Sequence, residues 1–340
     1  MLNNSTKVMF YMTLVGGILL TTSSNSWVGA WMGLEINLLS FIPIMVNNEN
    51  MFTTEASMKY FLVQVLASSL LLFVIVTLTV MEKSQLISKL FNHSNLMMIP
   101  LLLKSGAAPL HWWFPSVMEG MSWMNCLILM TLQKAAPMIL MSNMIMPSFQ
   151  LMTIVLMSVI IGSVGGLNQI SLRKMLTYSS INHMGWLLAA LLISNNLWMI
   201  YFMMYIIMTS TIILMIELNK ISFINQTFTM NHNSVFKFLM FITLLSLGGL
   251  PPFMGFFPKW IVIQHMINND YIIIPVAMIV FSLITLFYYL RITYSAFLMT
   301  HIKISWNLKM IDKIKPLNTT LIFLTIMGLI MLPLPFSIYL

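Results

Sequence analysis

Cysteine is nearly absent from this chain of 340 residues, which contains a single one, Cys126. A disulfide framework within the chain is therefore excluded, as is an iron–sulfur cluster or a structural zinc site held by several thiolates. No GxGxxG or GxxxxGK[ST] segment stands between a strand and a helix, so the sequence offers no support for nucleotide binding. The chain is therefore expected to bind no metal, nucleotide or redox cofactor of its own.

Charge is also scarce, since only 7% of the residues are charged and 59% are hydrophobic. Soluble domains carry about 25% charged residues, so this chain could not cover a surface that faces water. It could cover a surface that faces lipid, where backbone polar groups must be satisfied internally. The apolar stretches are long, unlike the short alternating segments of a membrane β-barrel. These features predict an all-α, polytopic membrane protein that forms a single transmembrane domain over residues 1–340.

The apolar runs predict about eleven membrane-spanning helices, because one such helix needs roughly twenty apolar residues. The predicted spans are residues 8–22, 26–46, 57–81, 96–115, 121–143, 149–169, 173–193, 196–219, 236–266, 272–299 and 318–339.

Two of these helices are expected to break, because proline removes a backbone donor and cannot continue a helix. The breaks fall in SGAAPLH at 105–111 and in GGLPPF at 248–253, and each is followed by aromatic residues and a further proline. Discontinuous helices in corresponding halves are typical of inverted-repeat transporters. The predicted halves are residues 26–169 and 173–299, with 318–339 as a peripheral last helix.

The basic residues predict the orientation of the chain. The net charge of +8 does not indicate a nucleic-acid partner, because the basic residues are dispersed. With eleven spans, Lys83 and Lys89 lie on one face, called face B. The opposite face, called face A, carries Lys7, Lys59, Arg173, Lys174, Lys220, Lys237, Lys303, Lys309, Lys313 and Lys315. This imbalance places the N-terminus on the cytoplasm-equivalent side.

Methionine is abundant, with 36 residues. Such richness is typical of proteins made inside metazoan mitochondria, whose genetic code gives methionine an extra codon. The sequence therefore predicts a multi-pass protein of the mitochondrial inner membrane with its N-terminus on the matrix side.

Four charged residues lie deep within the apolar spans. Glu35, Lys104 and Lys134 fall near the middles of predicted helices, and Lys259 follows the second break. A charge at the bilayer centre costs at least about 2.5–3.5 kcal/mol, so we expect these groups to face the bundle interior and a hydrated proton path. Alternatively, Glu35 pairs with one lysine and joins helices, but this leaves the other two lysines unpaired. Arg291 differs, because it could reach face A by snorkelling and is expected to be structural.

Two histidines are candidate proton relays, because histidine titrates near neutral pH. His111 follows the first break, and His183 lies in the predicted helix between the two repeats. Each has a structural alternative, which for His183 is a hydrogen bond to a neighbouring helix.

Several segments carry a family resemblance. They read SNSWVGAWMGLEINLLSFIP at 24–43, TTEASMKYFLVQVLAS at 53–68, LLKSGAAPLHWWFPSVMEG at 102–120, GGLNQISLRKMLTYSSINHMGW at 165–186 and LSLGGLPPFMGFFPKW at 245–260. With them the chain resembles the antiporter-like membrane subunits of respiratory complex I. The family's glutamate, three lysines and histidine fall on Glu35, Lys104, Lys134, Lys259 and His111.

The resemblance implies a core membrane subunit of a redox-driven proton pump, the proton-translocating NADH:ubiquinone reductase. NADH, FMN, iron–sulfur clusters and ubiquinone would then belong to other subunits. The implied partners are other membrane subunits of the complex, including neighbouring antiporter-like ones, and lipids such as cardiolipin. Two alternatives stay open: a stand-alone cation/proton antiporter, and a structural membrane anchor without proton flux of its own.

Overall fold

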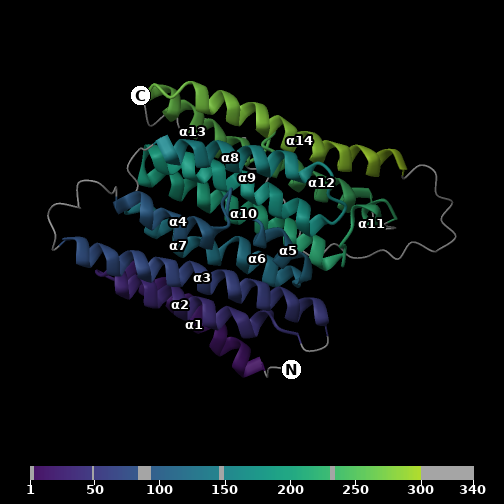
Figure 1. Ribbon diagram of the computed structural model, residues 1–340. Coiled ribbons are helices and arrows are strands. Elements are labelled where there is room, and N and C mark those ends of the chain that lie inside the picture. Colours follow the sequence, from purple (N-terminus) through teal and green to yellow (C-terminus); the bar gives the residue numbers. More distant parts are fainter. Residues whose placement is uncertain (1–3, 48–49, 83–92, 145–148, 230–233, 300–340) are drawn as a thin grey trace. The chain divides into compact units, whose positions relative to one another are not determined.

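The computed structural model describes residues 4–47, 50–82, 93–144, 149–229 and 234–299 (Figure 1). In these ranges the regular structure is helical, apart from an isolated antiparallel bridge between Ser171 and Phe223. Contacts group the chain into two compact units, Met1–Ile154 and Val155–Leu340. The predicted last helix at 318–339 lies outside the described residues.

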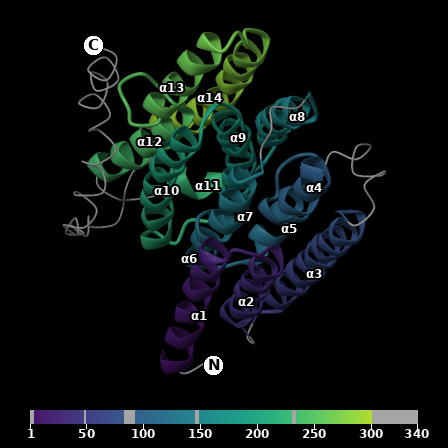
Figure 2. The ribbon, with the colours of Figure 1, turned by 90° about the vertical axis from the view of Figure 1, so that its left-hand side faces the viewer.

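The first unit is a helix bundle in which α1 to α4 pack side by side in chain order. Its helices are α1 (Asn4–Ser23), α2 (Trp27–Met45), α3 (Met51–Glu82), α4 (His93–Ser105), α5 (Trp113–Gly120), α6 (Trp123–Met130) and α7 (Leu132–Ser142). The long helix α3 packs against α2, α4 and α5, and α7 packs against α1, α2, α4 and α6 (Figures 1 and 2). The outward side of α3 is apolar, with Leu62, Leu66 and Phe73 all exposed, as expected for a helix that faces lipid.

The second unit is built around one buried helix. Its helices are α8 (Phe149–Gly166, which begins just before the boundary), α9 (Leu172–Ile193), α10 (Asn195–Leu218), α11 (Ile224–Thr229), α12 (Ser234–Gly248), α13 (Phe256–Asn268) and α14 (Ile273–Met299). Helix α9 contacts α10, α13 and α14 (Figure 2). In the stretch of α9 that is long enough to cross a membrane, 89% of the residues are buried. It nevertheless carries Ser180, Asn182 and His183, which are all buried. The unit therefore has polar side chains in its interior, where an apolar environment requires that they find hydrogen-bond partners.

The all-helical membrane architecture predicted from the apolar runs is confirmed. Within the described residues, seven helical segments are long and apolar enough to cross a membrane, one of them formed by α6 and α7 together, and two shorter apolar helices end at the predicted breaks. The total of eleven spans stays a prediction, as do the single transmembrane domain and its repeat-like halves.

The structure differs from the prediction in three details. Helix α3 begins at Met51 rather than 57, and the Thr53 hydroxyl bonds to the Asn50 carbonyl in its first turn at 2.7 Å. The connection predicted at 220–235 contains the short helix α11. The helix predicted at 121–143 is interrupted at Thr131, between α6 and α7.

Candidate functional site

The first predicted break is present between α4 and α5. Helix α4 ends because Gly106 adopts a φ of +71°, which a residue without a Cβ tolerates. The Gly106 N–H donates to the Leu103 carbonyl at 3.3 Å, and the Ala107 N–H donates to the Leu102 carbonyl at 3.2 Å. This pair of bonds is the Schellman motif, which closes a helix C-terminus.

Two side chains from outside α4 donate hydrogen bonds to backbone carbonyls at the end of this helix. The Trp113 indole donates to the Leu103 carbonyl at 3.1 Å, and the Gln64 amide, from α3, donates to the Lys104 carbonyl at 3.4 Å. Lys104 itself lies in the last turn of α4 and is 7% exposed. A cation is favourable at this end of a helix. The break is therefore an ordered structure with a buried lysine at its edge.

Glu35, on α2, is half-buried and interacts electrostatically with Lys104. Within the described residues no hydrogen bond or direct ion pair joins the two side chains, whereas Lys59 and Glu55 on the surface of α3 pair at 2.6 Å. Glu35 and Lys104 therefore interact electrostatically without a direct contact between their charged groups.

Lys134 lies at the interruption between α6 and α7. The Thr131 hydroxyl donates to the Leu127 carbonyl at 2.7 Å, and Pro137 cannot donate to the carbonyl four residues earlier, so the helix is irregular on both sides of the lysine. The Lys134 side chain is 2% exposed, and its Nζ lies 4.9 Å from the centre of the Phe114 ring. An aromatic face attracts a cation. The lysine is thus held deep in the first unit.

A chain of hydrogen-bonded side chains joins α3, α7 and α2 at positions close in sequence to these charged residues. The Tyr60 hydroxyl, on α3, donates to Gln133 Oε1 at 3.2 Å, and Gln133 Nε2, on α7, donates to Asn37 Oδ1, on α2, at 2.9 Å. Gln133 precedes Lys134, and Asn37 follows Glu35 by two positions. The sequence interpretation did not single out these three residues. The signal that could have found them is the presence of uncharged polar residues inside apolar spans, next to the buried charges.

His111 lies within the first break, between α4 and α5. It is 8% exposed, and its Nδ1 lies 3.3 Å from the Pro109 carbonyl oxygen. The structure thus places it in the same irregular segment as the end of α4, where a polar side chain can be accommodated.

The second predicted break is present between α12 and α13, in the second unit. Helix α12 ends at Gly248, and Gly249 adopts a φ of +84°. Lys259, on α13, is 5% exposed and donates from Nζ to the Gly248 carbonyl at 3.0 Å. Its Nζ also lies 5.7 Å from the centre of the Trp186 ring. The ammonium group therefore caps the carbonyl end of the broken helix, where the helix dipole favours a positive charge.

His183 lies among buried tyrosines in the second unit. Its Nδ1 is 2.9 Å from the Tyr201 hydroxyl, and its ring centre is 5.2 Å from that of Tyr205. Which of the two bonded atoms donates depends on the histidine tautomer. Tyr288 and Tyr289, on α14, are also fully buried. The sequence interpretation missed this tyrosine cluster, because residues on different helices come together only in the folded bundle.

The candidate residues are therefore distributed over both units. Glu35, Lys104, Lys134 and His111 belong to the first, and Lys259 and His183 belong to the second. The matching depth of Glu35, Lys104, Lys134 and Lys259 in the predicted spans also suggests that the four lie in one layer near the bilayer midplane, which stays a prediction. Among the described residues, no group of three or more His, Cys, Asp or Glu side chains could hold a metal ion.

Replacing Gly249 by alanine is expected to disturb Lys259 directly. The positive φ disfavours a side chain by about 1–2 kcal/mol, and an added Cβ would lie 3.0 Å from Lys259 Nζ. We expect the free energy of unfolding to fall by about 1–2 kcal/mol, measured by thermal unfolding of the protein in detergent. Gly248→Ala is the matched control, because its Cβ would meet nothing closer than Tyr289 Cδ2 at 3.5 Å. Equal effects of the two substitutions would contradict this prediction.

Comparison with known proteins identifies the family of the chain. The sequence profile of the family described as "NADH:quinone oxidoreductase/Mrp antiporter, TM" matches residues 24–285. NADH-ubiquinone oxidoreductase chain 2 of Anopheles gambiae is 48% identical over 97% of this chain and 98% of its own length.

Two solved structures have a similar fold. A chain of respiratory complex I from Thermus thermophilus aligns over 97% of this chain and 79% of its own length, with a TM-score of 0.81 and 22% identity. A chain of the Mrp complex from Dietzia sp. aligns over 83% of this chain and 59% of its own length, with a TM-score of 0.71 and 17% identity.

The broken helices and their buried lysines define the class as an antiporter-like polytopic membrane protein. Within this class, the chain belongs to the NADH:quinone oxidoreductase/Mrp antiporter family, since the family profile covers well over half of it and a near full-length relative is 48% identical. The resemblance seen in the sequence is confirmed.

Proposed function

We propose that this chain is a core membrane subunit of proton-pumping NADH:ubiquinone oxidoreductase (complex I) and that it carries a proton-translocation path. The observation that carries the proposal is the placement of Lys104, Lys134 and Lys259, each buried and each at an interruption of a helix. Interruptions of this kind provide backbone groups that can solvate an ion or water inside a membrane protein. The relationship to a complex I chain 2 over nearly its whole length supports the assignment to that complex.

In the first unit, Lys104 would take up the proton and pass it on. Burial disfavours the charged form of a lysine, and a nearby anion favours it. Because Glu35 acts on Lys104 through space without a direct ion pair, a small separation of the two would release the Lys104 proton towards Lys134. Moving one charge against 100 mV requires about 2.3 kcal/mol. Burial can raise the free energy of the charged form of a lysine by an amount of this size.

The second unit would receive the proton at Lys259. A charged Lys259 holds the Gly248 carbonyl, and a neutral one would hold it less tightly. Protonation is thereby linked to the conformation of the second break. His183 and Tyr201 supply a hydrogen-bonded pair that can pass a proton within the same unit.

The chemistry of electron transfer would belong to other subunits. NADH, FMN, iron–sulfur clusters and ubiquinone are assigned to partner subunits, in keeping with the single, buried cysteine of this chain. The neighbours in the membrane would be other antiporter-like subunits and lipids, among them cardiolipin. We place the chain in the mitochondrial inner membrane with its N-terminus on the matrix side, a placement that the excess of basic residues on face A supports.

The ratio of protons translocated to electrons transferred in the intact complex tests this function. A subunit that conducts protons predicts a loss of flux when a buried lysine is replaced. The structural-anchor alternative predicts that such a variant loses assembly, while the complexes that do assemble pump normally. The stand-alone antiporter alternative predicts cation/proton exchange by the chain reconstituted by itself in vesicles, which we do not expect.

Replacing Tyr201 by phenylalanine is expected to slow proton uptake by about 2- to 10-fold, because it removes the hydroxyl bonded to His183 Nδ1. The measurement is NADH-driven proton uptake together with quinone reduction, normalised to assembled complex. Tyr294→Phe is the control, since Tyr294 is 68% exposed on α14. If both variants retain full rates, His183 and Tyr201 form a structural contact and not a relay.

A further inference from the structure

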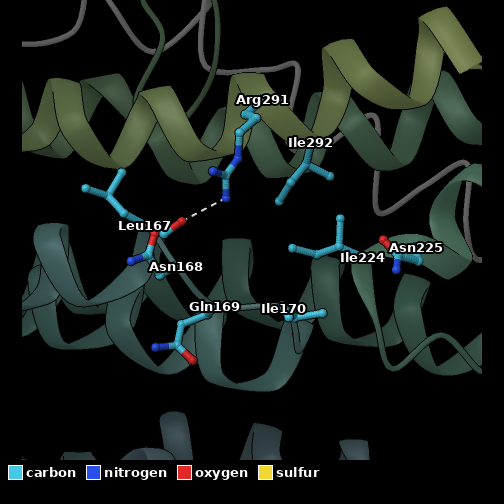
Figure 3. Close-up of a pocket in the computed structure, with 8 residues that line it drawn as sticks. All are labelled: Leu167, Asn168, Gln169, Ile170, Ile224, Asn225, Arg291 and Ile292. Atoms are coloured by element: carbon cyan, nitrogen blue, oxygen red, sulfur yellow. Dashed lines mark hydrogen bonds between the residues drawn. The ribbon is translucent and has the colours of Figure 1, made fainter.

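Arg291 occupies an unusual position on α14. The same helix exposes Leu283, Phe287 and Leu290, as expected of a surface in contact with lipid. The Arg291 guanidinium is also exposed and donates from Nη2 to the Leu167 carbonyl, just beyond the end of α8, at 2.8 Å (Figure 3). A permanently charged group is thus fixed at the lipid-facing surface of the second unit, outside the residues proposed to move protons.

A cavity of about 440 Å³ lies beside this guanidinium. Its lining consists of Leu167, Asn168, Gln169, Ile170, Ile224, Asn225, Arg291 and Ile292 (Figure 3). The lining therefore combines one cation and three amide side chains with four aliphatic ones, and it includes no carboxylate. Such a composition suits a ligand with an anionic head and an apolar body.

The loop before α9 and the loop before α11 form one side of the cavity and are joined by backbone hydrogen bonds. The Ile224 N–H donates to the Ile170 carbonyl at 3.1 Å, and the Leu172 N–H donates to the Ser222 carbonyl at 3.0 Å. The Gln169 amide donates to the Gly165 carbonyl at 3.1 Å, which attaches the loop to the end of α8. The cavity is consequently built from ordered backbone on one side and from α14 on the other.

The sequence next to the two cavity-lining loops is basic. Arg173 and Lys174 begin α9 directly after the lining loop, and Lys220 precedes α11. All three belong to face A, where the positive-inside imbalance lies. Basic pockets between membrane helices on this side of a membrane bind the head groups of anionic lipids.

We propose that this cavity binds the head group of an anionic phospholipid. The lipid phosphate accepts hydrogen bonds from the guanidinium N–H groups of Arg291, whose planar fork matches a phosphate. Asn168 and Asn225 offer further donors to the head group. The acyl chains follow Ile170 and the exposed apolar side of α14. The proposal depends on the membrane placement of the chain and not on the proton path.

Photo-crosslinking in the assembled complex tests the site. The probes are an anionic and a zwitterionic phospholipid with identical acyl chains, each carrying a photoreactive group, incorporated into vesicles that contain the complex. We expect the anionic probe to label peptides that contain residues 167–170, 224–225 or 291–292, and Arg291→Gln to reduce this labelling by about fivefold. Arg291→Lys retains the charge without the planar fork and should fall between the two.

A second variant separates loss of the cavity from loss of folding. Ile170→Trp adds bulk at a side chain that is 64% exposed on the cavity lining, and it leaves Arg291 in place. We expect it also to reduce labelling while assembly stays normal. Equal labelling by both probes would overturn the proposal, and so would unchanged labelling in Arg291→Gln. Absence of labelling, with the cavity covered by a neighbouring subunit, would overturn it as well.

Discussion

Replacing Lys134 by methionine is expected to slow NADH-dependent quinone reduction on the order of 10²-fold per assembled complex, because positioned acid–base groups contribute on this scale. Proton uptake should fall in parallel. Lys134 is 2% exposed and lies just after the interruption between α6 and α7, so its ammonium group is withdrawn from bulk water. In a tightly coupled pump, a blocked proton step stalls the redox step that is linked to it.

Methionine is chosen because it preserves the length and the apolar stem of lysine in a packed interior. The packing against Phe114 should therefore survive, whereas the proton-carrying group is lost. Lys59→Met is the control, since Lys59 lies on the exposed surface of α3 and pairs with Glu55 one turn earlier on the same helix. Both activities are measured against the amount of assembled complex. Normal turnover and normal proton stoichiometry in Lys134→Met would remove this lysine from the mechanism.

Replacing Lys104 by methionine is expected to produce the second-largest effect, a loss of roughly 10- to 10²-fold in both quinone reduction and proton uptake. The variant removes a proton carrier at the end of α4. It also leaves the Glu35 carboxylate without the cation that interacts with it, and an uncompensated charge inside a protein is destabilising. Both consequences act on the same step of the proposed path.

A double-mutant cycle measures this coupling. Glu35→Gln alone, Lys104→Met alone and the two together are compared for proton uptake per assembled complex. Because the residues interact electrostatically, the double variant should lose less than the product of the single losses. Strictly multiplicative losses would show that Glu35 and Lys104 act independently, and the proposed switch would then be wrong.

The helices and their breaks were largely predictable from the sequence. Apolar runs of membrane length and prolines after small residues determine where a chain can span and where a helix must stop, and both are local properties. The prediction was less accurate where the local signal is weak. Thr131 interrupts a helix without a glycine or proline at that position, and α11 forms in a segment that is too short and polar to show helical periodicity.

The sequence was sufficient to select the candidate residues, but it did not reveal which groups they contact. A charged residue inside an apolar span is conspicuous, so Glu35, Lys104, Lys134 and Lys259 could be selected without a structure. The hydrogen bond from Lys259 to the Gly248 carbonyl could not be predicted, because it depends on the path of the chain through the second break.

The sequence by itself determined the membrane class, the helical architecture, the two breaks and the buried charges, because each follows from hydropathy, proline chemistry or the cost of charge in lipid. The tertiary structure decided which side chains meet. The link from Tyr60 through Gln133 to Asn37 joins three helices, and the contact of Arg291 with the Leu167 carbonyl spans 124 positions of the chain. Such contacts depend on helix packing and rotation, which no local pattern specifies.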